Sequence, residues 1–188
     1  MPAPETVARF LVALGAVLVL AAVGANFLLA RGRPAMASER RSPVATATML
    51  AFFAAFWAVL RLGLTARRPP AAALWAGVAL VAAGTALNLL GRLHLGRAWG
   101  DHVVVWKEHP LVERGPYRLI RHPLYAGLIA MGAGAALVFG NPLALALVLL
   151  VFAPAMAWRA RLEERELERS LPGYAEYRRR TGMFLPRP

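Results

Sequence analysis

The side chains best suited to chemistry gather in the second half of the chain. All four histidines lie within 29 residues, at His94, His102, His109 and His122. Histidines that bind a metal from one helix are usually paired three or four residues apart, and these are not. The chain also has no Cys that would complete a thiolate site. The spacing therefore predicts no metal site.

The segment His109–Gly127 reads HPLVERGPYRLIRHPLYAG. The pair Gly115–Pro116 predicts a turn, and Pro123 is well placed to begin a helix, because its missing N–H costs nothing in the first turn. Arg121 and His122 then lie at a helix N-terminus, where free N–H groups and the helix dipole attract an anion such as a carboxylate. The alternative is a belt of Arg, His and Tyr side chains that anchors a helix end at the membrane surface.

A second polar segment, Arg159–Leu167, reads RARLEEREL. Arg159 and Glu163 lie one helical turn apart on the same face, and Glu164 follows directly. Taken alone, this pattern is typical of a solvated salt-bridge ladder, since surface pairs of this spacing are common and weak. Glu164 and Glu168 fit that interpretation best.

The elements that position these segments are apolar helices. Hydrophobic residues make up 59% of the 188 residues, which is more than a soluble core of this size needs. Runs near the ~20 residues needed to cross a bilayer are Val7–Ala30, Val44–Leu64, Ala71–Leu90, Leu124–Phe139 and Pro142–Trp158. Lipid cannot satisfy backbone polar groups, so each run must be a helix. The sequence predicts an all-α polytopic integral membrane protein with about five transmembrane helices.

Two local patterns refine this fold. Only residues 140–142, Gly-Asn-Pro, separate the last two runs, which predicts a tight helical hairpin with Asn141 capping its second helix. The third and fourth runs are rich in small residues, including Gly77, Gly84, Gly127 and Gly134, so these helices can approach closely. The alternative is that the small residues only reflect an Ala-rich composition. A cytoplasmic helical tail follows the hairpin.

The charges predict the orientation. Lys and Arg number 22 against 10 Asp and Glu, and the cations cluster at 31–43, at 91–122 and after 158. Because cations collect on the cytoplasmic side, we expect the C-terminus to be cytoplasmic and the N-terminus outside, in a bacterial inner membrane. No basic face is separable from the apolar runs, which argues against nucleic acid as a partner. The first run lacks a cationic segment ahead of it, so we expect a retained span rather than a signal peptide.

We treat residues 1–188 as one membrane domain. Residues 1–90 form a three-helix scaffold with few polar groups, and residues 91–188 hold the chemistry. The sequence does not indicate the oligomeric state.

Together, the two polar segments resemble the isoprenylcysteine carboxyl methyltransferase family and its bacterial relatives. The resemblance covers roughly residues 90–188, includes Tyr174, Tyr177 and Pro186, and is shared more distantly with the phospholipid N-methyltransferases. It implies an integral membrane methyltransferase that uses S-adenosylmethionine, releases S-adenosylhomocysteine and has no Rossmann domain. It also implies a cofactor pocket built from the C-terminal helices on the cytosolic side.

The resemblance also implies which residues form the site. The implied cofactor-binding residues are His109, Leu111, Val112, Tyr117, His122, Pro123, Tyr125 and Glu163. Arg159 is the implied acceptor-binding residue, and Arg159 and Glu163 are the implied catalytic residues. The turn before the fourth helix and the acidic end of the fifth should then enclose one cavity, with Tyr125 facing Glu163.

The methyl acceptor stays open at this stage. An isoprenylcysteine-like carboxylate, a lipid amine head group and a small hydrophobic acid all fit, and we expect the acceptor to arrive from the lipid bilayer. A rival interpretation is a non-catalytic transporter or sensor subunit that binds an anionic lipid or metabolite in the same basic region. A membrane reductase is a second rival, although the chain has no Gly-rich loop to hold a nicotinamide cofactor's phosphates.

Overall fold

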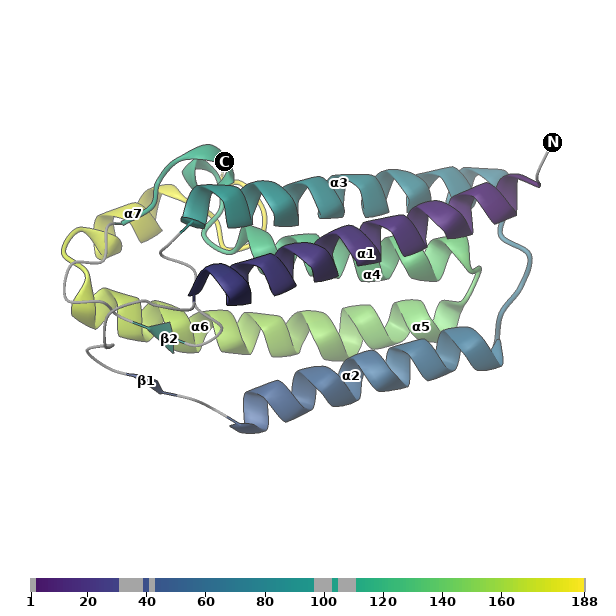
Figure 1. Cartoon of the computed structure of the whole chain (residues 1–188), viewed down its shortest axis with the longest axis horizontal. Helices are drawn as coiled ribbons and strands as arrows, with labels where there is room; N and C mark the ends of the chain where they lie inside the picture. The colour runs from purple at the N-terminus through teal and green to yellow at the C-terminus, as the bar shows by residue number, and fades with distance from the viewer. Residues whose placement is uncertain (1–2, 31–38, 41–42, 97–102, 105–110, 188) are drawn as a thin grey trace.

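The computed structural model describes residues 3–30, 39–40, 43–96, 103–104 and 111–187. Within these residues, long helices run up and down, and the two chain termini lie at opposite ends of the bundle (Figure 1). They are α1 (Pro4–Ala30), α2 (Pro43–Leu62), α3 (Ala71–Leu95), α4 (Pro123–Val138) and one continuous rod made of α5 (Pro142–Leu147), the π-helical segment η3 (Val148–Phe152) and α6 (Ala153–Ser170). The predicted helical class is confirmed.

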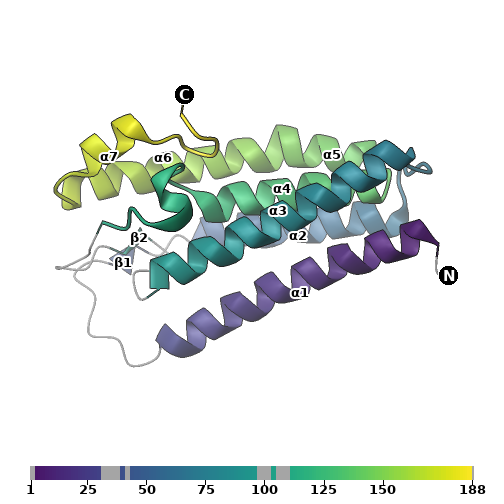
Figure 2. The same cartoon turned by 90° about the horizontal axis from the view of Figure 1, so that it is seen from above.

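Short elements gather at the end of the bundle opposite the N-terminus. They are the two-residue strands β1 (Glu39–Arg40) and β2 (Val103–Val104), which pair antiparallel, the 3-10 turn η2 (Gly115–Arg118) and the helix α7 (Tyr174–Arg180). Viewed from above, α7 folds back over α6, and the chain after α7 returns along the bundle (Figure 2). This end therefore brings the two polar segments of the sequence together.

Among the residues that the structure describes, three helices are long and apolar enough to cross a bilayer: Pro4–Asn26, Ala71–Leu95 and Pro142–Ser170. Two further apolar helices, Ala51–Leu62 and Pro123–Val138, fall below the usual length. Large apolar side chains point outward from the bundle, as Phe10 (64% exposed) and Leu150 (75% exposed) do. Three of the five predicted spans are thus supported by length and composition.

Glycine contacts fix the pairing of α3 with α4, which pack most extensively of all the helices. A Cβ added to Gly84 would lie 2.6 Å from the Gly127 carbonyl oxygen, and a Cβ on Gly127 would lie equally close to the Gly84 carbonyl. Gly77 meets Gly134 in the same way two turns further on. The predicted close approach of these helices is confirmed.

The turn from α4 into α5 is tight and is held by hydrogen bonds of Gly140 and Asn141. Gly140 has a φ of +57°, and its carbonyl accepts a hydrogen bond from the Arg67 backbone. Asn141 is 2% exposed, and its side chain accepts from the Ala144 N–H at 3.0 Å. Its amide nitrogen also donates to the Val59 carbonyl at 3.2 Å. Asn141 therefore caps the last rod, as predicted, and ties the hairpin to α2.

A π turn interrupts the last rod just before Pro154. Because Pro154 has no N–H and its ring crowds the preceding turn, regular α-helical bonding cannot pass through it, and the wider π turn takes its place. Phe152 at the end of this turn is buried and stacks on Phe52 of α2 with ring centroids 4.3 Å apart. This stack holds the start of α6 against α2.

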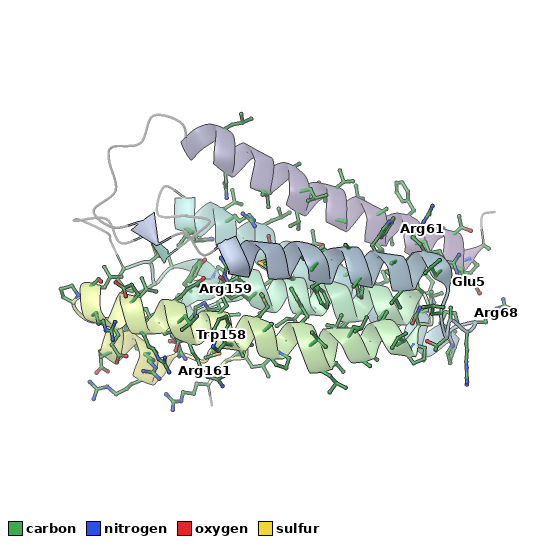
Figure 3. The ribbon with its side chains drawn as sticks, turned by 90° about the horizontal axis from the view of Figure 1, so that it is seen from below. Glu5, Arg61, Arg68, Trp158, Arg159 and Arg161 are labelled. Atoms are coloured by element: carbon green, nitrogen blue, oxygen red, sulfur yellow. The ribbon has the colours of Figure 1, made fainter. Side chains whose placement is uncertain are left out.

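Polar side chains mark both ends of the bundle (Figure 3). At one end, Arg68 donates to Glu5 at 2.9 Å, and Arg61 lies over the Trp57 ring. Trp158 and Arg159 mark the other end on α6 (Figure 3). The arrangement of an apolar middle with polar ends is that of a membrane bundle.

Candidate functional site

Tyr125 in the first turn of α4 faces Glu163 on α6. The Tyr125 hydroxyl donates a hydrogen bond to Glu163 Oε1 and accepts one from Arg159 Nε at 2.9 Å. Arg159 Nε also lies 3.3 Å from Glu163 Oε1, and its guanidinium lies over the Tyr125 ring. The three side chains form a closed triangle. The polar segment before α4 and the polar segment on α6 therefore lie in contact, and Tyr125 faces Glu163 as expected.

The triangle remains within reach of solvent. The side chains of Glu163 and Arg159 are 20% and 18% exposed. Glu163 Oε2 lies 3.7 Å from His122 Nδ1, and the His122 ring stacks parallel to Tyr125 with centroids 5.6 Å apart. Met49 of α2 contacts Arg159, with its sulfur 3.4 Å from Arg159 Nη1. Aromatic rings thus lie beside an accessible carboxylate, and a thioether lies beside the guanidinium.

Glu164, next in the chain, has the opposite environment. It is 2% exposed and accepts from Arg121 Nε at 2.7 Å. His122 Nε2 lies 3.2 Å from the same oxygen, and Arg178 Nε lies 3.5 Å from the other. The expectation that Glu164 belongs to a solvated ladder is therefore wrong, because its partners come from segments far along the chain. Glu164 joins α4, α6 and α7.

Arg121 and His122 do lie at the N-terminus of α4, but their polar groups already have partners. The Arg121 guanidinium also donates to the Thr181 carbonyl. Its backbone N–H donates to Gly182 at 2.9 Å, and that of His122 donates to Met183 at 3.1 Å. The anion expected at this helix end is the protein's own Glu164. The interfacial-belt alternative does not fit His122, which is buried.

Tyr117 and Leu111 lie in a neighbouring cluster with α7. The Tyr177 hydroxyl donates to the Tyr117 carbonyl at 2.8 Å, and both side chains are buried. Burial raises the pKa of Tyr117 and of Tyr177, so both stay neutral at ordinary pH. Leu111 packs against the buried cluster formed by Leu171, Tyr174 and Tyr177.

Of the remaining predicted cofactor residues, Pro123 and Val112 lie at or near the N-terminus of α4. Pro123 begins α4 and is fully buried beside Gly91 of α3. Val112 is half-buried just before η2. His109 lies outside the described residues. The structure thus brings Tyr125, Arg159 and Glu163 into mutual contact, and His122 contacts Tyr125 and Glu163.

Asn88 and Arg92 on α3 are polar residues whose role the sequence did not reveal. Asn88 is 0% exposed; its amide donates to the Leu124 carbonyl at 3.0 Å, and its oxygen accepts from Arg92 Nε at 2.9 Å. These bonds hold the first turn of α4 against α3. The sequence did contain a signal for this role, since Asn88 lies one turn before Arg92 in a mostly apolar helix, and polar residues within membrane helices usually bond to a neighbouring helix.

Residues 77–169 match the sequence model of the isoprenylcysteine carboxyl methyltransferase (ICMT) family. The matched range runs from α3 to the outer end of α6. It therefore contains Asn88, Tyr125, Arg159, Glu163 and Glu164.

Three curated relatives are similar to this chain. The cobalt-zinc-cadmium resistance protein CzcN of Cupriavidus metallidurans is 40% identical over 99 residues, which cover 50% of this chain and 44% of that protein. The nickel-cobalt-cadmium resistance protein NccN of Alcaligenes xylosoxydans is 35% identical over 121 residues, 60% of this chain and 53% of its own length. A probable protein-S-isoprenylcysteine O-methyltransferase of rice, Oryza sativa, is 29% identical over 115 residues, 60% of each chain. The chain spans about half the length of the first two relatives.

The fold is also similar to a solved structure, that of the eukaryotic intramembrane Ras methyltransferase ICMT. The TM-score is 0.57 at 22% identity, and the match covers 79% of this chain and 54% of the other. The sequence model of the isoprenylcysteine carboxyl methyltransferase family thus matches residues 77–169, just under half of this chain, and the fold around them is similar to that of the solved structure.

Proposed function

We propose that this protein is an S-adenosylmethionine-dependent methyltransferase of the membrane. The match of residues 77–169 to the isoprenylcysteine carboxyl methyltransferase family supports methyl transfer as the reaction. The single observation that carries the proposal is the contact of Tyr125 with Glu163 and Arg159, because it places an accessible carboxylate, an aromatic ring and a guanidinium in one site. Neither rival function requires this combination.

The charge environment of the two adjacent glutamates supports the assignment of the cofactor. The amino acid part of S-adenosylmethionine carries an ammonium, which needs an accessible carboxylate that is not already saturated. Glu163 is 20% exposed, whereas Glu164 is buried between Arg121 and His122. We therefore assign Glu163 to the ammonium, with Tyr125 and His122 as an aromatic wall beside it. Leu111, Val112, Tyr117, Pro123 and His109 complete the proposed lining.

When bound, S-adenosylmethionine supplies an electrophilic methyl group on a sulfonium. The chain's own residues then have to hold two ligands in line and exclude water, since no proton donor is needed at the methyl group. Arg159 is our choice for orienting the acceptor, because its planar guanidinium matches a carboxylate or phosphate. Tyr125 and Glu163 hold Arg159 Nε and so fix the plane of that guanidinium.

We infer that the acceptor is lipophilic or small and enters from the bilayer. The triangle lies at the polar end of α6, directly after the exposed Trp158, and Met49 of α2 contacts Arg159. An isoprenylcysteine-like carboxylate and a lipid amine head group both fit this position. The carboxylate acceptor is favoured by Arg159, which would repel an amine.

The proposed topology has five spans, with the N-terminus outside and the site and C-terminus in the cytoplasm of a bacterial inner membrane. The run Arg178, Arg179 and Arg180 on α7 lies at the site end, which suits the cytoplasmic face. Residues 1–90 serve as scaffold, and residues 91–188 bind cofactor and acceptor.

Calorimetric titration of the purified protein with S-adenosylhomocysteine tests this function. We expect binding to the wild-type protein and a loss of about tenfold or more in Glu163→Gln, since a charge-assisted hydrogen bond contributes about 1.5–3 kcal/mol. Glu166→Gln is the matched control, because Glu166 on the same helix pairs only with Arg169 in the described residues. Absence of binding to the wild-type protein would favour the transporter or sensor alternative, and binding of a nicotinamide cofactor instead would favour a reductase.

A further inference from the structure

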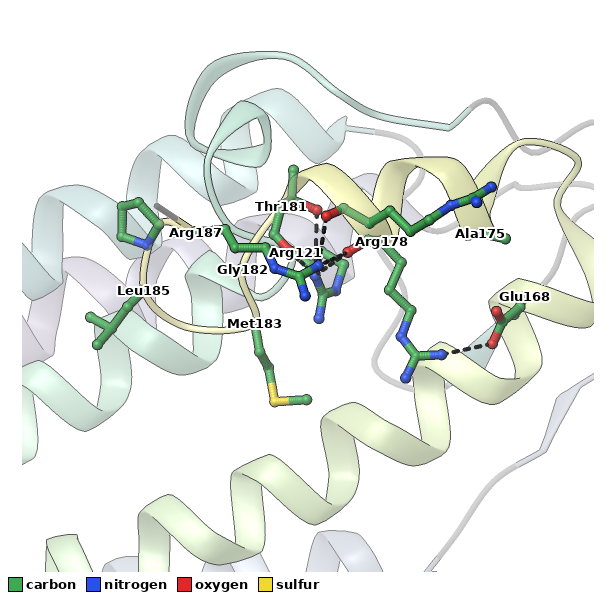
Figure 4. Close-up of a pocket in the computed structure, with 11 residues that line it drawn as sticks. Arg121, Glu168, Ala175, Arg178, Thr181, Gly182, Met183, Leu185 and Arg187 are labelled. Carbon is green, nitrogen blue, oxygen red and sulfur yellow. Dashed lines mark hydrogen bonds and ion pairs between the residues drawn. The ribbon is translucent and has the colours of Figure 1, made fainter.

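A hollow of about 580 Å³ lies between the outer part of α6, α7 and the chain that follows α7 (Figure 4). Its lining residues are Arg121, Glu168, Ala175, Arg178, Arg179, Thr181, Gly182, Met183, Leu185, Pro186 and Arg187. None of these belongs to the proposed cofactor site, and the proposed methyl transfer makes no use of the hollow. The hollow therefore needs a separate explanation.

The lining is strongly cationic. Four Arg line the hollow with one carboxylate, that of Glu168, which pairs with Arg178 at 3.0 Å. Arg121 pairs with Glu164, which does not line the hollow. Arg179 pairs with Glu176 outside the hollow, and its side chain is 75% exposed. Arg187 donates to the Arg179 carbonyl at 2.6 Å, and among the described residues it meets no carboxylate. Within the described residues, the positive charge of Arg187 is thus left without a carboxylate, which favours an anionic occupant.

One side of the hollow is apolar. Met183 and Leu185 line the side nearer the transmembrane part of α6, and Glu168 and Ala175 line the side nearer its outer end (Figure 4). The Leu185 side chain is 78% exposed. A Cβ on Gly182 would overlap the Leu185 carbonyl, so the tight turn that presents these side chains requires glycine there. The lining of the hollow is therefore apolar on the side toward the membrane and becomes polar and charged toward the outer end of α6.

The depth of the hollow matches the lipid headgroup layer. Trp158 on α6 is 59% exposed, and exposed Trp side chains lie at the boundary between hydrocarbon and headgroups. Glu164, which contacts Arg178 at the hollow, is six residues further, or about 9 Å along the helix. Each headgroup layer is roughly 5–8 Å thick, so the cations lie at or just beyond it.

We propose that this hollow binds the phosphate headgroup of an anionic membrane lipid. Arg179 and Arg187 provide the charge for the phosphate, and Met183 and Leu185 contact the glycerol and the upper acyl chain. A soluble phosphate would leave that apolar side unused, which is why a lipid is the better fit. The bound lipid would hold the C-terminal segment, and with it Arg121, against the membrane surface.

Native mass spectrometry of the full-length protein in detergent tests the proposal, with phosphatidylglycerol and phosphatidylcholine of identical acyl chains as probes. We expect the wild-type protein to retain phosphatidylglycerol preferentially. The Arg179→Gln/Arg187→Gln variant should bind it about tenfold or more weakly, since each cation near an anionic surface contributes about fivefold. Arg165→Gln/Arg169→Gln is the control, because it removes the same charge from exposed positions of α6 that do not line the hollow.

Three outcomes would overturn the proposal. They are equal retention of the two lipids by the wild-type protein, an equal loss in the control variant, and displacement of phosphatidylglycerol by millimolar inorganic phosphate. The last would identify a site for a soluble anion. Thermal unfolding of both variants without lipid, which should match the wild-type protein, ensures that altered binding is not altered folding.

Discussion

Glu163 and Glu164 are neighbours in the chain but have opposite surroundings. Glu163 is accessible and bonded to Tyr125, whereas Glu164 is buried against Arg121 and His122. Successive residues on a helix point about 100° apart, so one carboxylate faces the candidate site and the other faces the packed interior. The acidic pair therefore divides into a ligand-binding residue and a structural one.

Removal of the buried charge should destabilise the protein strongly. Glu164→Gln leaves Arg121 without its carboxylate partner, and we expect a loss of about 3–5 kcal/mol, the usual effect of breaking a buried pair. Thermal unfolding in detergent measures it. Glu166→Gln, whose partner Arg169 is 75% exposed, should change stability by less than about 1 kcal/mol. Equal effects in the two variants would show that Glu164 is not buried as described.

Helix contact between α3 and α4 gives a second prediction. Gly84→Ala places a Cβ 2.6 Å from the Gly127 carbonyl, so the helices must separate, and we expect a loss of about 1–3 kcal/mol from overpacking. The matched control is Gly24→Ala in α1, where a Cβ would meet nothing within 4 Å. That variant should be neutral or up to about 1 kcal/mol more stable. Unfolding curves that rank the two variants in the reverse order would contradict this packing.

The Tyr177 hydrogen bond predicts a pH dependence of stability. Burial raises the pKa of Tyr177 above its ordinary value near 10, so unfolding becomes linked to proton release in alkali. The stabilisation from Tyr177 should be fully present below about pH 10 and should decline as the pH rises further. Tyr177→Phe should lose about 1–3 kcal/mol at pH 7, because the buried Tyr117 carbonyl then has no donor from Tyr177.

Comparison of the wild-type protein with Tyr177→Phe between pH 7 and pH 11 isolates this residue from the other buried tyrosines. The difference in unfolding free energy should shrink above about pH 10. A difference that stays constant across this range would contradict the raised pKa of Tyr177.

The proposed roles of Arg159 and Glu163 can be separated by kinetics. Arg159→Ala should abolish turnover and leave S-adenosylhomocysteine affinity within about tenfold, because it removes the acceptor's partner but not the carboxylate that holds the cofactor. Glu163→Ala should weaken cofactor binding itself. Equal loss of both properties in both variants would show that the triangle acts as one unit.

Local features of the fold could be predicted from the sequence because they depend on neighbours in the chain. Asn141 after Gly140 fixed the hairpin and its cap, and Gly84 and Gly127 indicated the close helix pair. The helical turn expected between Arg159 and Glu163 is also observed, because α6 continues past the apolar run to Ser170.

Long-range pairing could not be predicted in the same way. Glu164 was interpreted as exposed because its local pattern is that of a surface ladder, and only the fold brings Arg121 and Arg178 to it. A signal did exist, since Met156, Ala160 and Glu164 follow one another at four-residue spacing and all three are buried. Because Glu164 is charged, this buried face of α6 does not stand out as an apolar pattern in the sequence.

Methyl transfer from S-adenosylmethionine to an acceptor in the membrane is the reaction that we propose for this chain. The most direct test incubates the purified protein with methyl-labelled S-adenosylmethionine and a lipid extract, and then follows label into the organic phase. We expect the wild-type protein to label a lipophilic or small acidic acceptor and Arg159→Ala to label none. If the folded wild-type protein, supplied with the extract, labels no acceptor, the chain does not transfer a methyl group from S-adenosylmethionine to a membrane acceptor.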